Sequence, residues 1–204
     1  MNISEYKKNS QMVFYSLIGM AAMTLITAIV TLAVFTGGIL AILSGDLSGF
    51  VWIILCALLT VTAYVFYFIG LTGFTKLYIG TPDEEAMGKV RLAALLGLIG
   101  VGCTIIPIAG AIINFILSII SAIFLIIGWN TLKSSTTFQV PKAANLIFIA
   151  AIVSLCGAVL AIIPVVGIIG SLAGLAAFIL QVIAWAQIMN YNFSNEQPQQ
   201  YNNY

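Results

Sequence analysis

Long apolar runs separated by short polar stretches constrain this chain more than any other feature. Four such runs cover residues 12–43, 50–74, 91–129 and 145–189. A helix needs about 20 apolar residues to cross the hydrocarbon core of a bilayer, which is roughly 30 Å thick. Every run reaches that length, and only 6% of the 204 residues are charged. The sequence therefore predicts an all-α membrane protein whose main partner is the lipid bilayer.

The two longest runs are each interrupted once by the same short pattern. Residues 105–110 are Ile-Ile-Pro-Ile-Ala-Gly, and residues 162–167 are Ile-Ile-Pro-Val-Val-Gly. An unbroken helix over 91–129 would be about 58 Å long, nearly twice the thickness of the hydrocarbon core. Proline removes a backbone donor and glycine tolerates a chain reversal. Hairpin turns are therefore expected at four positions, Pro107, Gly110, Pro164 and Gly167.

These turns divide the chain into a bundle of six spans, arranged as three helical hairpins. The expected spans are 12–36, 50–74, 91–106, 109–130, 145–163 and 167–189. The first either ends near 36 or continues as a longer tilted helix to about 43. Asparagine and glutamine dominate residues 191–204, a composition typical of a disordered tail.

The basic residues indicate how such a bundle is oriented. With six spans, all seven Lys and Arg residues lie on one side, and the opposite loops contain none. Cytoplasmic loops of membrane proteins carry an excess of Lys and Arg. Both termini, and the tail with them, are therefore expected in the cytoplasm. The small size and short loops favour a bacterial inner membrane.

The last two hairpins are related by an internal repeat. Residues 94–133 align with 151–190 at an offset of 57, which matches Gly100 with Gly157 and the two Ile-Ile-Pro turns with each other. Both copies begin on the same side, so the repeat is parallel. Spans 12–36 and 50–74 show a weaker likeness, because their connecting turn has no proline.

Several function classes are disfavoured by the inventory of side chains. There is no His, and Cys56, Cys103 and Cys156 are far apart, so no zinc-ligand spacing exists and no cofactor is expected. Seven scattered cations cannot form the basic face that binds nucleic acid. No acid–base pair or Gly-x-Ser-x-Gly nucleophile motif is present. The chain is therefore expected not to be an enzyme.

Polar residues inside the spans are uncharged. Ionisable groups within spans mark proton relays and ion paths, and the expected spans hold none away from their ends. Asn114 and Gln181 are the candidates for a polar interior. Serine and threonine in such spans more often bond to their own helix or to a neighbouring helix than to a ligand.

Small residues predict where helices pack closely. Gly170 and Gly174 form a small-xxx-small pair, and Ala150, Ser154 and Ala158 form a stripe on one helix face. Such faces allow close approach between two spans of one chain, or between two membrane proteins.

Two functions follow from these features. The first is a non-enzymatic scaffold, accessory subunit or interaction partner that acts through helix packing, with other membrane proteins or a second copy as its partner. The alternative is a channel or carrier for a small neutral or weakly polar solute, not driven by a carboxylate relay within the membrane.

Overall fold

The fold was analysed in a computed structural model that describes residues 2–44, 48–104, 106, 109–160 and 167–193. These residues form six α-helices and no strand: α1 (Ile3–Ser44), α2 (Ser48–Lys76), α3 (Glu84–Cys103), α4 (Ala109–Leu132), α5 (Pro141–Leu160) and α6 (Gly167–Met189). All six are long and apolar enough to cross a membrane. The prediction of an all-helical protein with six helices of membrane-spanning length is therefore confirmed, and these helices suggest an integral membrane protein.

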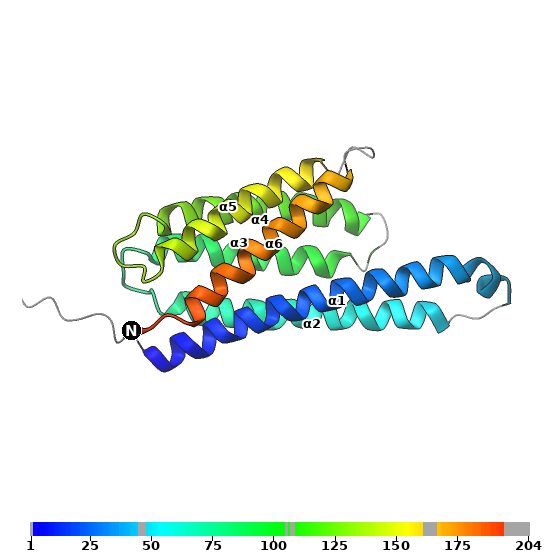
Figure 1. Cartoon of the computed structure of the whole chain (residues 1–204), viewed down its shortest axis with the longest axis horizontal. Helices are drawn as coiled ribbons and strands as arrows, with labels where there is room; N and C mark the ends of the chain where they lie inside the picture. The colour runs from blue at the N-terminus through cyan, green and yellow to red at the C-terminus, as the bar shows by residue number, and fades with distance from the viewer. Residues whose placement is uncertain (1, 45–47, 105, 107–108, 161–166, 194–204) are drawn as a thin grey trace, which may run out of the picture.

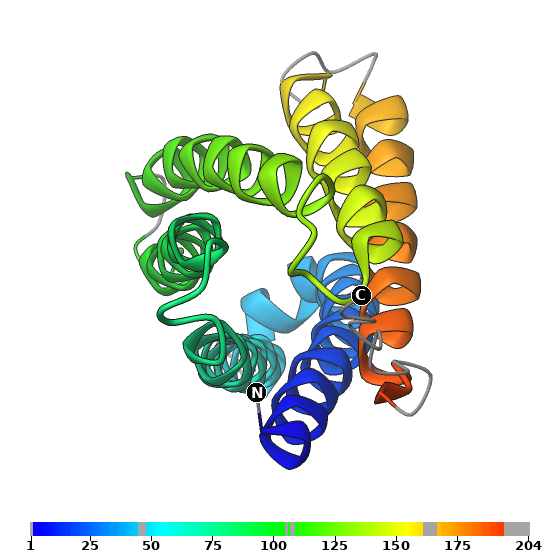
Figure 2. The same ribbon diagram turned by 90° about the vertical axis from the view of Figure 1, so that its left-hand side faces the viewer.

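The six helices form a closed ring (Figure 2). Each helix packs against the next one along the chain, and α1 packs against α6. The most extensive contacts join α1 to α2, α3 to α4, and α5 to α6. Successive helices run in opposite directions along the long axis of the molecule (Figure 1).

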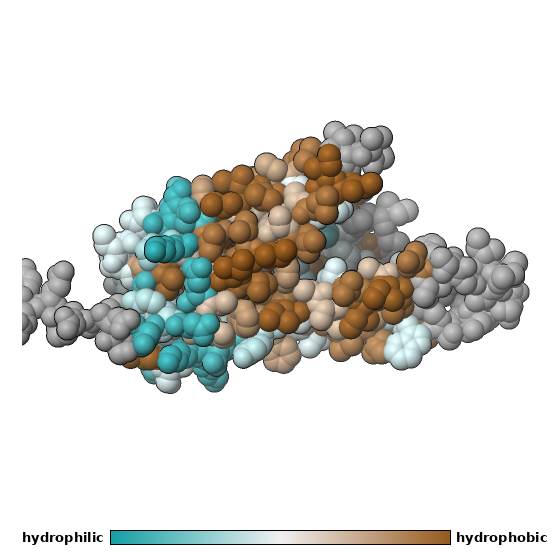
Figure 3. Space-filling view, viewed as in Figure 1, coloured by the Kyte–Doolittle hydropathy of each residue, from teal (hydrophilic) through white to brown (hydrophobic). Residues whose placement is uncertain are grey.

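Polar residues gather at one end of the ring (Figure 3). Both ends of the described chain lie there, since the rings of Tyr6 and Phe193 are 5.0 Å apart. Along the rest of the helices, large apolar side chains face outward, including Ile29, Leu58 and Leu172, each more than half exposed. An apolar outer surface of this extent suits lipid and not water.

The helices extend beyond several of the expected spans. Helix α1 has 42 residues and ends at Ser44, which fits the longer alternative to about 43; at 1.5 Å per residue it is about 63 Å long. Helix α3 begins at Glu84, before the expected span 91–106, and α5 begins at Pro141, before the expected span 145–163. Hydropathy locates the apolar part of a helix, whereas backbone hydrogen bonding continues through polar turns outside it. Proline suits the first position of α5, where its missing N–H is not needed.

Glycines mark the points where the two helices of a hairpin come closest. A Cβ atom added at Gly70 of α2 would lie 3.0 Å from Met12 Cβ on α1. One added at Gly128 of α4 would lie 2.9 Å from the Ala86 carbonyl oxygen on α3. At these two positions only glycine lets the backbones approach so closely.

Candidate functional site

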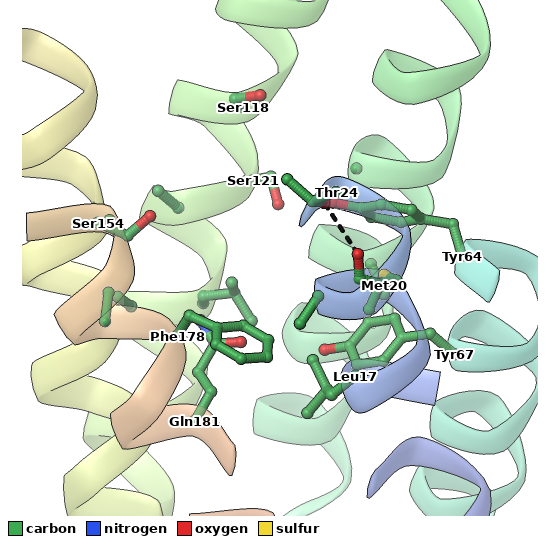
Figure 4. A pocket seen from close by; sticks show the side chains of 18 of the residues that line it. Leu17, Met20, Thr24, Tyr64, Tyr67, Ser118, Ser121, Ser154, Phe178 and Gln181 are labelled. Carbon is green, nitrogen blue, oxygen red and sulfur yellow. Dashed lines mark hydrogen bonds between the residues drawn. The ribbon is translucent and has the colours of Figure 1, made fainter. Parts of the chain in front are cut away.

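The centre of the ring contains a cavity of about 650 Å³, to which all six helices contribute (Figure 4). Ligand sites in proteins typically measure about 300–1,000 Å³, so this cavity is large enough for a small organic molecule. No charged residue lines it. Its polar lining consists of uncharged residues: Thr24, Tyr64, Tyr67, Ser118, Ser121, Ser154 and Gln181.

The cavity is not filled by side chains, because two of the helices present only small residues to it. Helix α3 contributes Ala93, Ala94 and Gly97, and α5 contributes Ala151 and Ser154. None of these reaches far enough to fill the centre of the ring. Other helices add small residues too, such as Ala21 of α1 and Gly174 of α6, but α3 and α5 contribute only small side chains to the lining.

Two of the cavity hydroxyls are already used in hydrogen bonds within the protein. Thr24 Oγ1 donates to the Met20 carbonyl oxygen one turn earlier in α1, at 2.8 Å. Ser121 Oγ donates to the Ala93 carbonyl oxygen at 2.8 Å, which joins α4 to α3. These groups stabilise the wall of the cavity and have no free hydrogen-bond donor for a ligand.

Tyr67 and Gln181 face each other across the cavity. The hydroxyl of Tyr67 on α2 points toward Phe178 and Gln181 on α6 (Figure 4). Within the part of the chain that the structure describes, neither the Tyr67 hydroxyl nor the Gln181 amide has a hydrogen-bond partner. A phenol and an amide in a site of this kind can each bond to a molecule in the cavity.

A cluster of aromatic side chains closes the cavity toward the polar end of the bundle. We call this cluster the aromatic floor; it consists of Tyr6, Phe74, Tyr78, Trp129, Phe138 and Trp185. Neighbouring rings lie 5.2 to 6.1 Å apart between centroids. All six side chains are at most 3% exposed, so the floor is tightly packed.

Phe138 reaches the floor from the loop between α4 and α5. Two hydrogen bonds hold the loop in place: Tyr78 Oη to Gln139 Oε1 at 2.6 Å, and Thr137 Oγ1 to Asp83 Oδ2 at 2.5 Å. Burial raises the pKa of Tyr78 above its ordinary value, and the nearby Tyr6 and Asp83 raise it further. The Tyr78 phenol therefore remains neutral and able to donate at physiological pH.

The structure separates the two residues expected in a polar interior. Gln181 lines the cavity. Asn114 does not contribute to the lining: it is half-buried in α4, and its side chain lies against Gly100 of α3. The sequence analysis did not select Tyr64, Tyr67 or Phe178 as site residues. The pair of tyrosines three residues apart in an apolar span was the available signal for two of them.

The small residues selected for helix packing have different surroundings. Ala150 and Gly170 are buried, Ala158 is half-buried, and Ser154 and Gly174 line the cavity. A Cβ atom at Gly157 of α5 would lie 2.9 Å from the Gly170 carbonyl oxygen, so Gly170 belongs to the contact between α5 and α6.

The expected turn residues are only partly described. Gly110 lies in the first turn of α4, directly against the carbonyl group of Cys103 at the end of α3, and Gly167 begins α6. Pro107, Pro164 and the tail from residue 194 onward lie outside the described residues.

Comparison with known proteins adds no family to this picture. No family model, curated protein or solved structure matches the chain. Among the described residues, no group of three or more His, Cys, Asp or Glu side chains could hold a metal ion. The function has to be inferred from the cavity and its surroundings.

Proposed function

We propose that this protein binds a small uncharged solute in its central cavity and lets it pass through the membrane, as a carrier or channel and not as an enzyme. The cavity of about 650 Å³, lined from all six helices by uncharged polar and small side chains, is the observation that carries the proposal. An ionised solute would have to leave water for a site with no opposite charge, which costs several kcal/mol or more.

We further propose a topology of six spans in three hairpins, with both termini in the cytoplasm of a bacterial inner membrane. The seven cations support it, because all lie at or near the helix ends that share the polar end of the bundle: Lys7, Lys8, Lys76, Lys89, Arg91, Lys133 and Lys142. This is the pattern of the positive-inside rule.

The proposed repeat of the last two hairpins is supported by burial. The buried residues of α3 are Ala86, Met87, Val90, Ala93, Ala94 and Gly100. Those of α5 are Ala143, Ala144, Ile147, Ala150, Ala151 and Gly157. Each residue of the second set follows its counterpart in the first by 57 positions, the offset found in the sequence. Matching burial registers are what two copies of one hairpin would have.

The proposal is tested by asking whether the cavity contains water. In a background without native cysteines, Ser118→Cys and Ser154→Cys would be exposed to a membrane-impermeant thiol reagent in sealed vesicles of each orientation. Thiols react as thiolates, which form readily in water and poorly in lipid. Both cavity positions should therefore be labelled from at least one side.

The matched control is Ile116→Cys, on α4 but outside the cavity lining, with a side chain that is 51% exposed on the apolar surface. It should resist labelling because it faces lipid. Labelling of all three positions alike would mean that the reagent enters the bilayer. A cavity that labels from neither side would be dry, and the carrier or channel proposal would be wrong.

The scaffold function remains a second proposal, supported by a different part of the molecule. The outer ends of α1 and α2 extend beyond the other four helices (Figure 1). At this end of α2, Val51, Trp52 and Ile54 are about 60% exposed. An apolar pair of helices without neighbours offers a surface for another membrane protein. A scaffold needs no water-filled cavity, so a dry cavity would favour this function.

A further inference from the structure

The second helices of the three hairpins, α2, α4 and α6, carry large buried side chains at matching positions. In the aromatic floor and just beside it, α2, α4 and α6 each contribute two large, fully buried side chains. The first set is Leu71, Trp129 and Trp185, and the second is Phe74, Leu132 and Ile188. Both sets have the same spacing, 58 positions from α2 to α4 and 56 from α4 to α6.

The same spacing identifies equivalent positions within the cavity. One turn above the floor it relates Tyr67, Leu125 and Gln181; in the next layer it relates Tyr64, Ala122 and Phe178. All six residues line the cavity. These positions lie four and seven residues before the floor residues, on the same helix faces, so each trio faces the interior as the floor residues do.

The side chains at these equivalent positions differ sharply in chemistry. Helix α4 supplies an aliphatic and a small side chain, Leu125 and Ala122, whereas α2 and α6 supply three aromatic rings and an amide. At the equivalent floor positions all six side chains are large and apolar, whereas the cavity positions range from alanine to a phenol and an amide. The difference is therefore concentrated on the α2 and α6 sides of the cavity.

We propose that this asymmetric cluster, Tyr64, Tyr67, Phe178 and Gln181, recognises a flat, uncharged ring compound that carries an amide or carbonyl group. This inference rests on the proposed function and names its class of ligand. The Tyr67 hydroxyl donates to the ligand's carbonyl oxygen. The Gln181 amide can donate to the same oxygen and accept from a ligand N–H. The ring of the ligand packs against Phe178 and Tyr64, since aromatic rings associate in stacked or edge-to-face pairs.

The test uses tritiated 2-naphthamide as the probe, with the full-length protein in phosphatidylcholine nanodiscs and equilibrium dialysis against protein-free nanodiscs. Naphthalene has the ring without the amide, and 2-naphthoate has the ring with a negative charge. Saturable binding should be seen for naphthamide, weaker binding for naphthalene, and none for naphthoate.

Two variants remove the polar groups while preserving most of the side-chain volume. Tyr67→Phe and Gln181→Leu should each weaken naphthamide binding by about three- to tenfold, the usual effect of losing one neutral hydrogen bond. Naphthalene binding should not change. The matched controls are Tyr15→Phe and Gln187→Leu, both exposed residues outside the cavity lining, which should bind naphthamide as the unmodified protein does.

Failure of this inference can be distinguished from failure of the proposed function. If the cavity cysteines label but naphthamide does not bind, or if cavity and control variants bind it equally, the ligand class is wrong and a solvated pathway remains. If the cavity cysteines do not label and naphthamide does not bind, both proposals are overturned.

Discussion

The contact between α5 and α6 gives a sharp test of the fold through the substitution Gly157→Ala. The added Cβ would lie 2.9 Å from the carbonyl oxygen of Gly170 and 3.1 Å from Ala173 Cβ. Ordinary contacts begin at about 3.4 Å. Because the nearest atom belongs to the backbone of a helix, it cannot rotate away, and the two helices must separate by about half an ångström at this point. Overpacking of this kind typically costs about 1–3 kcal/mol.

Two other glycines in helix interiors serve as matched controls. At Gly88 nothing lies within 4 Å of an added Cβ, so Gly88→Ala should gain up to about 1 kcal/mol from helix propensity alone. At Gly100, the repeat counterpart of Gly157, the nearest atom is Asn114 Oδ1 at 2.5 Å. That oxygen ends a flexible side chain that can turn aside, so Gly100→Ala should be nearly neutral. The gain in helix propensity is the same for Gly157→Ala and Gly88→Ala, so it cancels when the two are compared. The Gly157→Ala variant should therefore be about 1–3 kcal/mol less stable than the Gly88→Ala variant.

The measurement is unfolding by sodium dodecyl sulfate in mixed micelles, followed by tryptophan fluorescence. Trp129 and Trp185 are suitable reporters, because both are 1% exposed and their rings pack edge to face at 6.1 Å. Trp52 would be replaced by Phe in every variant, since it is exposed and reports on a distant part of α2. If Gly157→Ala and Gly88→Ala agree within about 0.5 kcal/mol, the close approach of α5 and α6 is refuted.

Three further predictions concern the loop, the floor and the cavity. Thr137→Val leaves the buried Asp83 carboxyl group without its hydroxyl donor, and should lower the free energy of unfolding by about 1–3 kcal/mol. The control is Thr136→Val, at an exposed neighbouring position, which should have no effect in the same unfolding assay. Because burial raises the pKa of Tyr78, the folded state keeps this proton at pH values where the unfolded chain loses it. The free energy of unfolding should therefore be retained up to about pH 10, the ordinary tyrosine pKa, and fall above it. Measured from about pH 8 to 12, this fall should be shallower for Tyr78→Phe. An unchanged slope would show that the Tyr78 proton does not cause it. Gly97→Leu places a side chain in the cavity at a position where an added Cβ meets nothing within 4 Å. It should preserve the free energy of unfolding and reduce thiol labelling of the engineered cysteines at positions 118 and 154. Full labelling would show that the leucine does not enter the cavity.

The number of helices and their apolar character could be predicted from sequence because each apolar run has the length that a bilayer requires. Span length follows from the thickness of the hydrocarbon core, and backbone polar groups in lipid have to be satisfied within each helix. The ends of the helices could not be located from the apolar runs, because the helices continue into polar turns. Helix α3 begins at Glu84 and includes the ion pair of Glu85 with Lys89, where nitrogen and oxygen are 2.7 Å apart. Such polar turns are helical but contribute nothing to an apolar run.

The residues of the cavity were harder to predict, because facing lipid and facing the interior both favour apolar side chains. In a helix of a soluble protein, the contrast between polar and apolar faces shows which side is buried. Helix α4 has no such contrast, since exposed Ile116 and buried Ala122 are both apolar. Asn114 lies four residues from Ser118, on the same face of α4, yet it packs against Gly100 of α3 instead of lining the cavity. The depth and rotation of each helix decide this, and neither can be inferred from composition.

The proposed repeat would explain how a ring of similar hairpins holds the proposed binding site. Matching small residues on α3 and α5 provide the space, and matching large residues at the floor close it, so both features come from what the copies share. A symmetric ring would present the same group from three directions, which suits a symmetric ligand or none. With Tyr67 opposite Gln181 and only Leu125 at the third position, the cavity has a polar side and an apolar side at one depth. An asymmetric ligand can then bind in a single orientation, and this orientation depends on the few positions at which the hairpins differ.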